Sequence, residues 1–186
     1  MDKNYYYLIS QLPSLQYGEK APYTPDEFLE QCKEMLSKSD YDGLKYCTLD
    51  IDVLDGAPLT QWDFINTWVA RERTMRYALS HLRSVNLKRD DDEEQLEAPH
   101  ESPRTEAGAH VAFAMGDPLE AEIYLDKNRW ENIESIQGHD NFGINVIFAH
   151  VLKLKLMQRR LSFIPDEGLA EYKALYASIL QGAGKV

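Results

Sequence analysis

The stretch TQWDFINTWVARERTMRYALSHLRSVNL, residues 60–87, decides the fold class. It contains neither glycine nor proline, the two residues that most often interrupt a helix. Apolar side chains recur near helical spacing at Trp62, Ile65, Val69, Leu79 and Leu82. Such a stripe is buried against other elements when the helix folds. The stretch therefore predicts one long amphipathic helix from Thr60 to Leu87 within an all-α fold.

Proline placed directly after a capping residue marks the start of further helices. In Thr24-Pro25-Asp26-Glu27, the position of Glu27 is that of a capping-box carboxylate. Asp117 and Pro118 repeat the arrangement in the second half. The opening YYYLISQLP has the aromatic content of a short strand, but Pro13 also suits the end of a short helix, which we favour. The other predicted helices cover residues 25–37, 118–136 and 141–163. A last helix is predicted to begin at Pro165 and to end at Gly182.

An acidic, proline-containing stretch over residues 89–103 divides the chain. It carries the run DDDEE, whose like charges repel one another, and its prolines oppose a continuous helix. We therefore expect a solvated linker or hairpin tip at 89–103 between two related helical units, residues 1–88 and 104–186. The two units are predicted to pack into one elongated helical bundle.

The composition limits the classes of function. A formal net charge of -11 argues against nucleic-acid binding, which depends on Lys and Arg neutralising phosphates. The two cysteines, Cys32 and Cys47, form neither a metal-ligand motif nor a disulfide framework, and so indicate reduced thiols of the cytoplasm. No signal peptide or membrane span is recognisable, so we expect any contact with a membrane to run through partners. The lack of a glycine-rich phosphate-binding motif argues against nucleotide hydrolysis.

Charged residues within the predicted helices are the first candidates for a site. Glu72 and Arg76 are spaced i, i+4, as in a helix-stabilising ion pair. Asp126 lies on the expected inward face, where it is either a catalytic carboxylate with a raised pKa or, as we favour, one half of a buried ion pair. The expected partners of Asp126 are Arg129, Lys127 or an arginine of the first half of the chain.

Several arginines are candidates for contacts with other proteins, because the guanidinium group forms bidentate pairs with carboxylates. The set, which is equally compatible with ordinary solvated helix faces, is Arg71, Arg73, Arg76, Arg129, Arg159 and Arg160. The aromatic run Tyr5, Tyr6 and Tyr7 has two interpretations. It forms either an interface anchor or, as we favour, the packing of a short N-terminal element into the core.

A metal site is the main enzymatic alternative. His139 and Asp140 are adjacent, as in helical metal-dependent phosphohydrolases, and His150 or His110 would supply a further ligand. The more ordinary interpretation is a loop histidine beside an aspartate that caps the next helix. No nucleophilic triad is recognisable from the sequence, because triads are defined by geometry.

Two segments of the second half resemble a known family. PLEAEIYLDKNRW, residues 118–130, is similar to the acidic helix, Leu-Asp-basic step and following aromatic of the helical repeats in the C subunit of V-type ATPases. NVIFAHVLKLK, residues 145–155, resembles the next helix of that family, where an Asn-Ile pair precedes basic and apolar residues. In the first half, YYYLISQLP (5–13), FINTW (64–68) and ERTMR (72–76) resemble a short bacterial family encoded beside V-type ATPase genes.

The resemblance implies a non-catalytic subunit without cofactor or metal. It would lie on the cytoplasmic side, peripheral to the inner membrane, as a socket that links the membrane rotor ring to the central-stalk subunits during proton or sodium transport. The chain is shorter than a typical C subunit of this family, which implies that at least one of the usual three helical repeats is missing. Two alternatives stay open at this point: a small helical metal-dependent hydrolase that uses His139, Asp140 and His150, and a generic helical adaptor protein.

Overall fold

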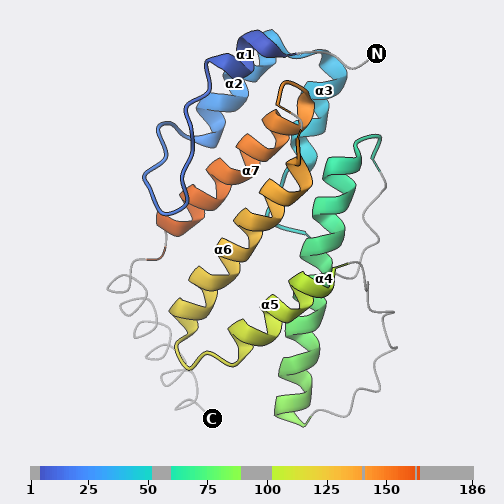
Figure 1. Ribbon diagram of the computed structural model, residues 1–186, viewed down its shortest axis with the longest axis vertical. Helices are drawn as coiled ribbons and strands as arrows, with labels where there is room; N and C mark the ends of the chain where they lie inside the picture. Colours follow the sequence, from blue (N-terminus) through green and yellow to red (C-terminus); the bar gives the residue numbers. More distant parts are fainter. Residues whose placement is uncertain (1–4, 52–59, 89–101, 140, 162, 164–186) are drawn as a thin grey trace, which may run out of the picture.

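The described structure is helical throughout. A computed structural model describes residues 5–51, 60–88, 102–139, 141–161 and 163, and no strand occurs in these ranges (Figure 1). The helices are α1 (Tyr6–Ser10), α2 (Pro25–Met35), α3 (Lys38–Gly43), the short 3-10 helix η1 (Leu44–Tyr46), α4 (Asp63–Leu87), α5 (Pro103–Phe113), α6 (Pro118–Gln137) and α7 (Ile144–Leu161). The predicted all-α fold class is therefore confirmed.

The long helix predicted over residues 60–87 is α4, although it begins at Asp63. Thr60 lies outside the helix because its backbone N–H donates to Asn66 Oδ1 at 2.8 Å. Asn66 Nδ2 in turn donates to the carbonyl of Thr60, also at 2.8 Å. At the other end the chain leaves the helix through Lys88, which has a left-handed φ of 50°.

The capping signals place the other helices. At α2 the Thr24 hydroxyl accepts from the backbone N–H of Glu27, and the Glu27 carboxylate accepts from that of Thr24, which completes the capping box. At α6 the Asp117 carboxylate accepts from Leu119 N at 2.8 Å. α2 ends at Met35, two residues before the predicted end, because Leu36 is extended and the next residue caps α3.

The helix α5 is absent from the sequence-based prediction. Pro103 is not part of a linker: it is the first residue of α5, with Ser102 as the N-cap that accepts from Thr105 N. Elsewhere the differences are of a few residues: the helix predicted over 141–163 is α7, and the favoured N-terminal helix is α1. The last predicted helix, from Pro165, lies outside the described residues.

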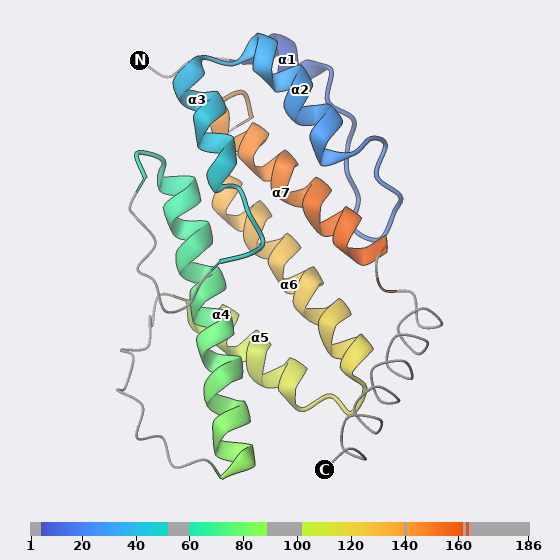
Figure 2. The same ribbon diagram turned by 180° about the vertical axis from the view of Figure 1, so that it is seen from behind.

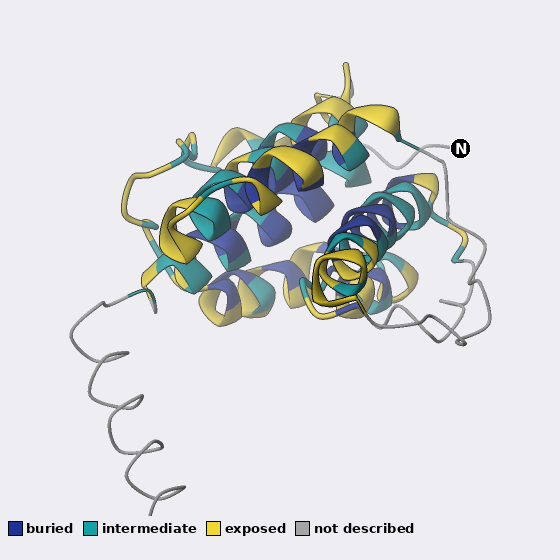
Figure 3. Cartoon of the chain, turned by 90° about the horizontal axis from the view of Figure 1, so that it is seen from below, coloured by how far each residue is buried: buried dark blue, intermediate teal, exposed yellow. Residues whose placement is uncertain are grey.

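The helices are arranged around α6 and α7, which lie side by side (Figures 1 and 2). α4 packs against α6 on one side, and α5 crosses the lower part of both α4 and α6. α1, α2 and α3 gather at the other end of the molecule, where α2 packs against α7. Buried residues follow the inward faces of the helices (Figure 3). Within the described part of the chain, no helix is both long enough and apolar enough to cross a membrane.

Two apolar cores lie inside this arrangement. The larger contains residues from both sides of the acidic stretch, among them Phe28, Trp68 and Phe148, each at most 1% exposed. The smaller core joins α4, α5 and α6 through Met75, Ala78, Leu79, Ala109, Ala112 and Leu125. The division into residues 1–88 and 104–186 stays a prediction, but the larger core shows that the two parts pack into one body.

Candidate functional site: a buried ion-pair network

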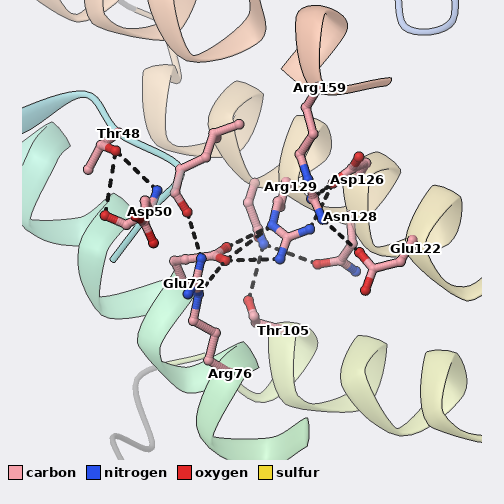
Figure 4. Close-up of polar contacts among 12 residues, drawn as sticks. Thr48, Asp50, Glu72, Arg76, Thr105, Glu122, Asp126, Asn128, Arg129 and Arg159 are labelled. Atoms are coloured by element: carbon pink, nitrogen blue, oxygen red, sulfur yellow. Dashed lines mark hydrogen bonds and ion pairs between the residues drawn. The ribbon is translucent and has the colours of Figure 1, made fainter. Parts of the chain in front are cut away.

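A buried ion pair joins α4 and α6 (Figure 4). Arg129 Nη2 donates to Glu72 Oε1 at 2.9 Å, and Arg129 Nε donates to Glu72 Oε2 at 3.0 Å. Glu72 is 1% exposed and Arg129 is 6% exposed. Burial by itself lowers the pKa of Arg129, but Glu72 and Asp126 outweigh it and hold that pKa above its usual value. Arg129 is therefore charged, and α4 and α6 are joined by a two-point contact.

The network continues from α6 to α7 through Asp126. Asp126 Oδ1 accepts from Arg129 Nη1 at 2.7 Å and from Arg159 Nη1 at 2.5 Å. Arg159 Nη2 also donates to Glu122 Oε2 at 2.9 Å, which ties the last turns of α7 to the first turns of α6. The predicted pairing of Asp126 with Arg129 is confirmed, but the second arginine comes from α7 and not from the first half of the chain.

The two oxygens of Asp126 have different surroundings. Oδ2 is buried and accepts no hydrogen bond from the described residues, while Oδ1 accepts from both arginines. Burial raises the pKa of Asp126 above 3.8, although Arg129 and Arg159 both act to lower it. The two arginines thus hold the ionised carboxylate in place, but removing it from water costs free energy.

The network also reaches the loop before α4. Arg76 Nε donates to Glu72 Oε1 at 3.0 Å, which confirms the predicted i, i+4 pair, and Arg76 Nη2 donates to the carbonyl of Leu49 at 2.6 Å. Nearby, Trp68 Nε1 donates to the carbonyl of Thr48 at 2.9 Å. These bonds fasten the loop along α4.

A row of neutral polar groups lies beside the charges, between α5 and α6. Asn132 Nδ2 donates to Thr105 Oγ1 at 3.3 Å and to Asn128 Oδ1 at 3.1 Å (Figure 4). Gly108 of α5 faces Asn128 so closely that a Cβ at this position would lie 2.5 Å from the Asn128 amide nitrogen. α5 is therefore packed tightly on α6, next to the ion-pair network.

The arginines predicted as partner contacts have different environments. Arg129 lies inside the chain, so its assignment to a partner surface is wrong: its guanidinium is taken up by Glu72 and Asp126. Arg76 and Arg159 have side chains that are 32% exposed, but both belong to internal ion pairs. Arg160 and the two remaining arginines are half-buried.

Those three arginines also differ in their contacts. The guanidinium of Arg160 lies over the ring of Tyr17, 5.1 Å from its centroid. Arg73 is half-buried on α4 and has an interaction partner. Arg71 Nη1 donates to the backbone and side-chain carbonyls of Asn132, both at 3.4 Å.

The candidate metal ligands are not brought together in the described residues. His139 is exposed, Asp140 lies outside the described residues, and His110 is exposed on α5. His150 is buried against Phe28, and its Nε2 is 2.7 Å from the Tyr23 hydroxyl. Burial lowers the pKa of His150 to about 4. No group of three His, Cys, Asp or Glu side chains in the described ranges is placed to hold a metal ion.

The N-terminal tyrosines divide between the two predicted roles. Tyr5 is half-buried, packs against the larger core and donates its hydroxyl to Asp40. Tyr6 and Tyr7 are 60% and 70% exposed, and the ring of Tyr6 lies 5.2 Å from that of Phe142. Core packing, the favoured role, therefore applies to Tyr5 alone among the three.

Cys32 and Cys47 are buried free thiols. Burial raises the pKa of each to about 12, so both stay protonated at neutral pH. The thiols are therefore poor nucleophiles in this environment.

Comparisons with protein-family models, with curated proteins and with solved structures found no match.

The chemistry available to the network follows from its charge balance. Three carboxylates face three guanidinium groups, and every one of these six residues is an ion-pair partner of another: Glu72, Glu122, Asp126, Arg76, Arg129 and Arg159. Such a set fixes the relative positions of the helices that supply it. Neither a poised nucleophile nor a free general base is among these six residues.

Proposed function

We propose that this chain is a non-catalytic component of a bacterial V-type ATPase, similar to the C subunit of that family, which links the membrane rotor ring to the central stalk. The observation that carries the proposal is the neutral ion-pair network across α4, α6 and α7. The segments that resemble the V-type ATPase family, residues 118–130 and 145–155, supply Asp126 and Arg129 and most of α7. The resemblance therefore falls on the helices that the network joins.

The mechanism of such a subunit would be rigid coupling. A part that transmits torque has to resist sliding between its helices. Glu72 and Arg129 fix α4 to α6, while Arg159 fixes α7 to α6 through two carboxylates. Because buried charges tolerate little misalignment, sliding of one helix against another would leave a charge unpaired in the interior. The chain would bind to the membrane only through the other subunits of the complex, on its cytoplasmic side.

The test is an assay of coupling in membrane vesicles from a native host that lacks this chain. ATP hydrolysis and ATP-driven ion uptake are measured in parallel, before and after the wild-type chain is restored. We expect the ratio of uptake to hydrolysis to fall without the chain and to recover with it. A ratio that is the same in both membranes would contradict the proposal.

Two variants sharpen this assay. Glu72→Ala removes the centre of the network, whereas Glu131→Ala removes one half of an exposed pair with Arg104, whose side chains are 39% and 67% exposed. At equal amounts of chain in the membrane, we expect only Glu72→Ala to lower the ratio.

The hydrolase alternative makes a different prediction. An enzyme that used His139, Asp140 and His150 would retain a stoichiometric divalent ion through purification. Elemental analysis of the purified chain measures this, and one equivalent of zinc or manganese would favour the enzyme. Among the described residues, the bond between His150 and Tyr23 gives that alternative no support.

A further inference from the structure

Arg71 differs from the three arginines of the buried network in having no counter-charge among the described residues. It forms no ion pair with any Asp or Glu of the described residues, whereas Arg76, Arg129 and Arg159 all do. The chain has 31 acidic residues against 20 basic ones, so acidic partners for an arginine are plentiful in the sequence. Arg71 is moreover half-buried, where a missing counter-charge costs more than on an exposed helix face.

The contacts that Arg71 does make hold it in place without neutralising it. Nη1 donates to the backbone carbonyl and to Oδ1 of Asn132, and both distances are 3.4 Å, near the outer limit of a hydrogen bond. Asn132 is itself fixed by its bonds to Thr105 and Asn128. The guanidinium has five N–H donors, and the contacts with Asn132 use only Nη1. Within the described ranges, no hydrogen bond uses the edge formed by Nε and Nη2, which has the geometry of a bidentate donor.

The surroundings of Arg71 add positive charge. Burial lowers the pKa of Arg71, and repulsion by Arg104, in the first turn of α5, lowers it further. Arg104 is paired with Glu131 at 2.6 Å, so the three side chains together carry one surplus positive charge. This charge lies where α4, α6 and the start of α5 meet.

We propose that Arg71 receives a carboxylate from an acidic side chain of a partner protein at the junction of α4, α6 and α5. The fork of the guanidinium matches the two oxygens of an Asp or Glu. A carboxylate there would neutralise the surplus charge that the chain itself leaves uncompensated. The identification of the partner as a neighbouring ATPase subunit rests on the proposed function, but the recognition of a carboxylate does not.

The experiment uses the full-length tagged chain, purified from native membranes with whatever binds to it. Arg71→Lys places an amine at the site, and a carbodiimide joins an amine to a carboxylate in direct contact with it. Arg83→Lys is the matched control, because Arg83 is exposed and lies on the same helix. We expect mass spectrometry to find residue 71 joined to an Asp or Glu of a co-purifying protein, and residue 83 not joined to it.

A binding measurement accompanies the cross-linking. Arg71→Gln removes the charge and is expected to lower recovery of the partner about tenfold, while Arg83→Gln leaves it unchanged. Circular dichroism confirms that both variants are folded.

The outcomes separate this inference from the proposed function. A cross-link from residue 71 to a protein unrelated to ATPases would support the inference and contradict the proposed function. Recovery of ATPase subunits with no cross-link at 71, or with a cross-link only to this chain's own acidic residues, would overturn the inference and leave the function standing. Recovery of no protein at all would overturn both.

Discussion

Glu72 and Arg129 meet across the centre of the protein, 57 residues apart in the chain, with both side chains almost completely buried. Arg76 and Asp126 extend this contact on its two sides. Since α4 and α6 touch in the interior through this pair, its removal tests how much the helical framework depends on it.

We expect Glu72→Ala to lower the free energy of unfolding by about 3–5 kcal/mol, because the buried Arg129 then keeps only Asp126, which it shares with Arg159, as a counter-charge. Urea unfolding followed by circular dichroism measures the loss. The control, Glu131→Ala, breaks the exposed pair with Arg104 and is expected to cost at most about 1 kcal/mol.

The double variant Glu72→Met, Arg129→Met separates charge pairing from packing. Replacing both partners of a buried pair by apolar residues of similar size is often close to neutral. The double variant should therefore be more stable than Glu72→Ala. A double variant that is as unstable as the sum of two single losses would show that the pair is not the unit of stabilisation.

Asp126 should titrate above 3.8 in the folded protein, because its burial outweighs the two arginines. A raised folded-state pKa means that the folded state binds the proton more tightly than the unfolded state, so this group stabilises the protein as the pH falls through that pKa. Carbon-13 NMR of the side-chain carboxyl measures the pKa directly. The free energy of unfolding of the wild type relative to Asp126→Asn should increase from pH 7 towards pH 4. A pKa of Asp126 below 3.8 would contradict this account.

The pKa of His150 is lowered, so this residue makes the folded protein less stable as the pH falls, which is the opposite of the effect of Asp126. Its pKa is about 4 in the folded state against 6.5 for the free side chain, since burial disfavours the charged ring. Its contribution is fully present above pH 6.5 and is lost as the pH falls towards 4, by about 3 kcal/mol in total. Urea unfolding between pH 4.5 and 7 should show this slope in the wild type and a flatter one in His150→Gln. His81→Gln, at an exposed position, should leave the slope unchanged.

Gly43 is required by the close approach of two aromatic rings. A Cβ added at Gly43 would lie 2.9 Å from the Trp62 ring and 3.0 Å from the Phe148 ring. Gly43→Ala should thus lower the free energy of unfolding by about 1–3 kcal/mol, despite the better helix propensity of alanine. Gly116→Ala is the control, because no atom of the described part of the chain lies within 4 Å of its added Cβ. Equal stability of the two variants would show that the rings move aside without cost.

The sequence predicts those parts of the fold that depend on interactions between residues close together in the chain. α2, α4 and α6 begin near their predicted positions, since a capping residue, a following proline and a glycine-free run act locally. The pairs between Glu72 and Arg76 and between Asp126 and Arg129 are predictable for the same reason, because helical spacing alone brings them together.

The errors have two physical causes. The sequence-based prediction misses α5 although Ser102 and Pro103 carry the same capping signal as Thr24 and Pro25, because the acidic run before it makes the prolines resemble those of a linker. The burial of Arg129 and its pairing with Glu72 depend on how α4 packs against α6, and no local pattern specifies that packing. The single cue is Asp126, whose inward position requires a buried cation nearby.

The most direct test of the account is quantitative mass spectrometry of the proteins that co-purify with the tagged chain from native membranes. A coupling role predicts V-type ATPase rotor-ring and central-stalk subunits in fixed proportion to the chain, enriched over an untagged control. Recovery of the chain alone, or with proteins of another system in their place, would contradict the central claim.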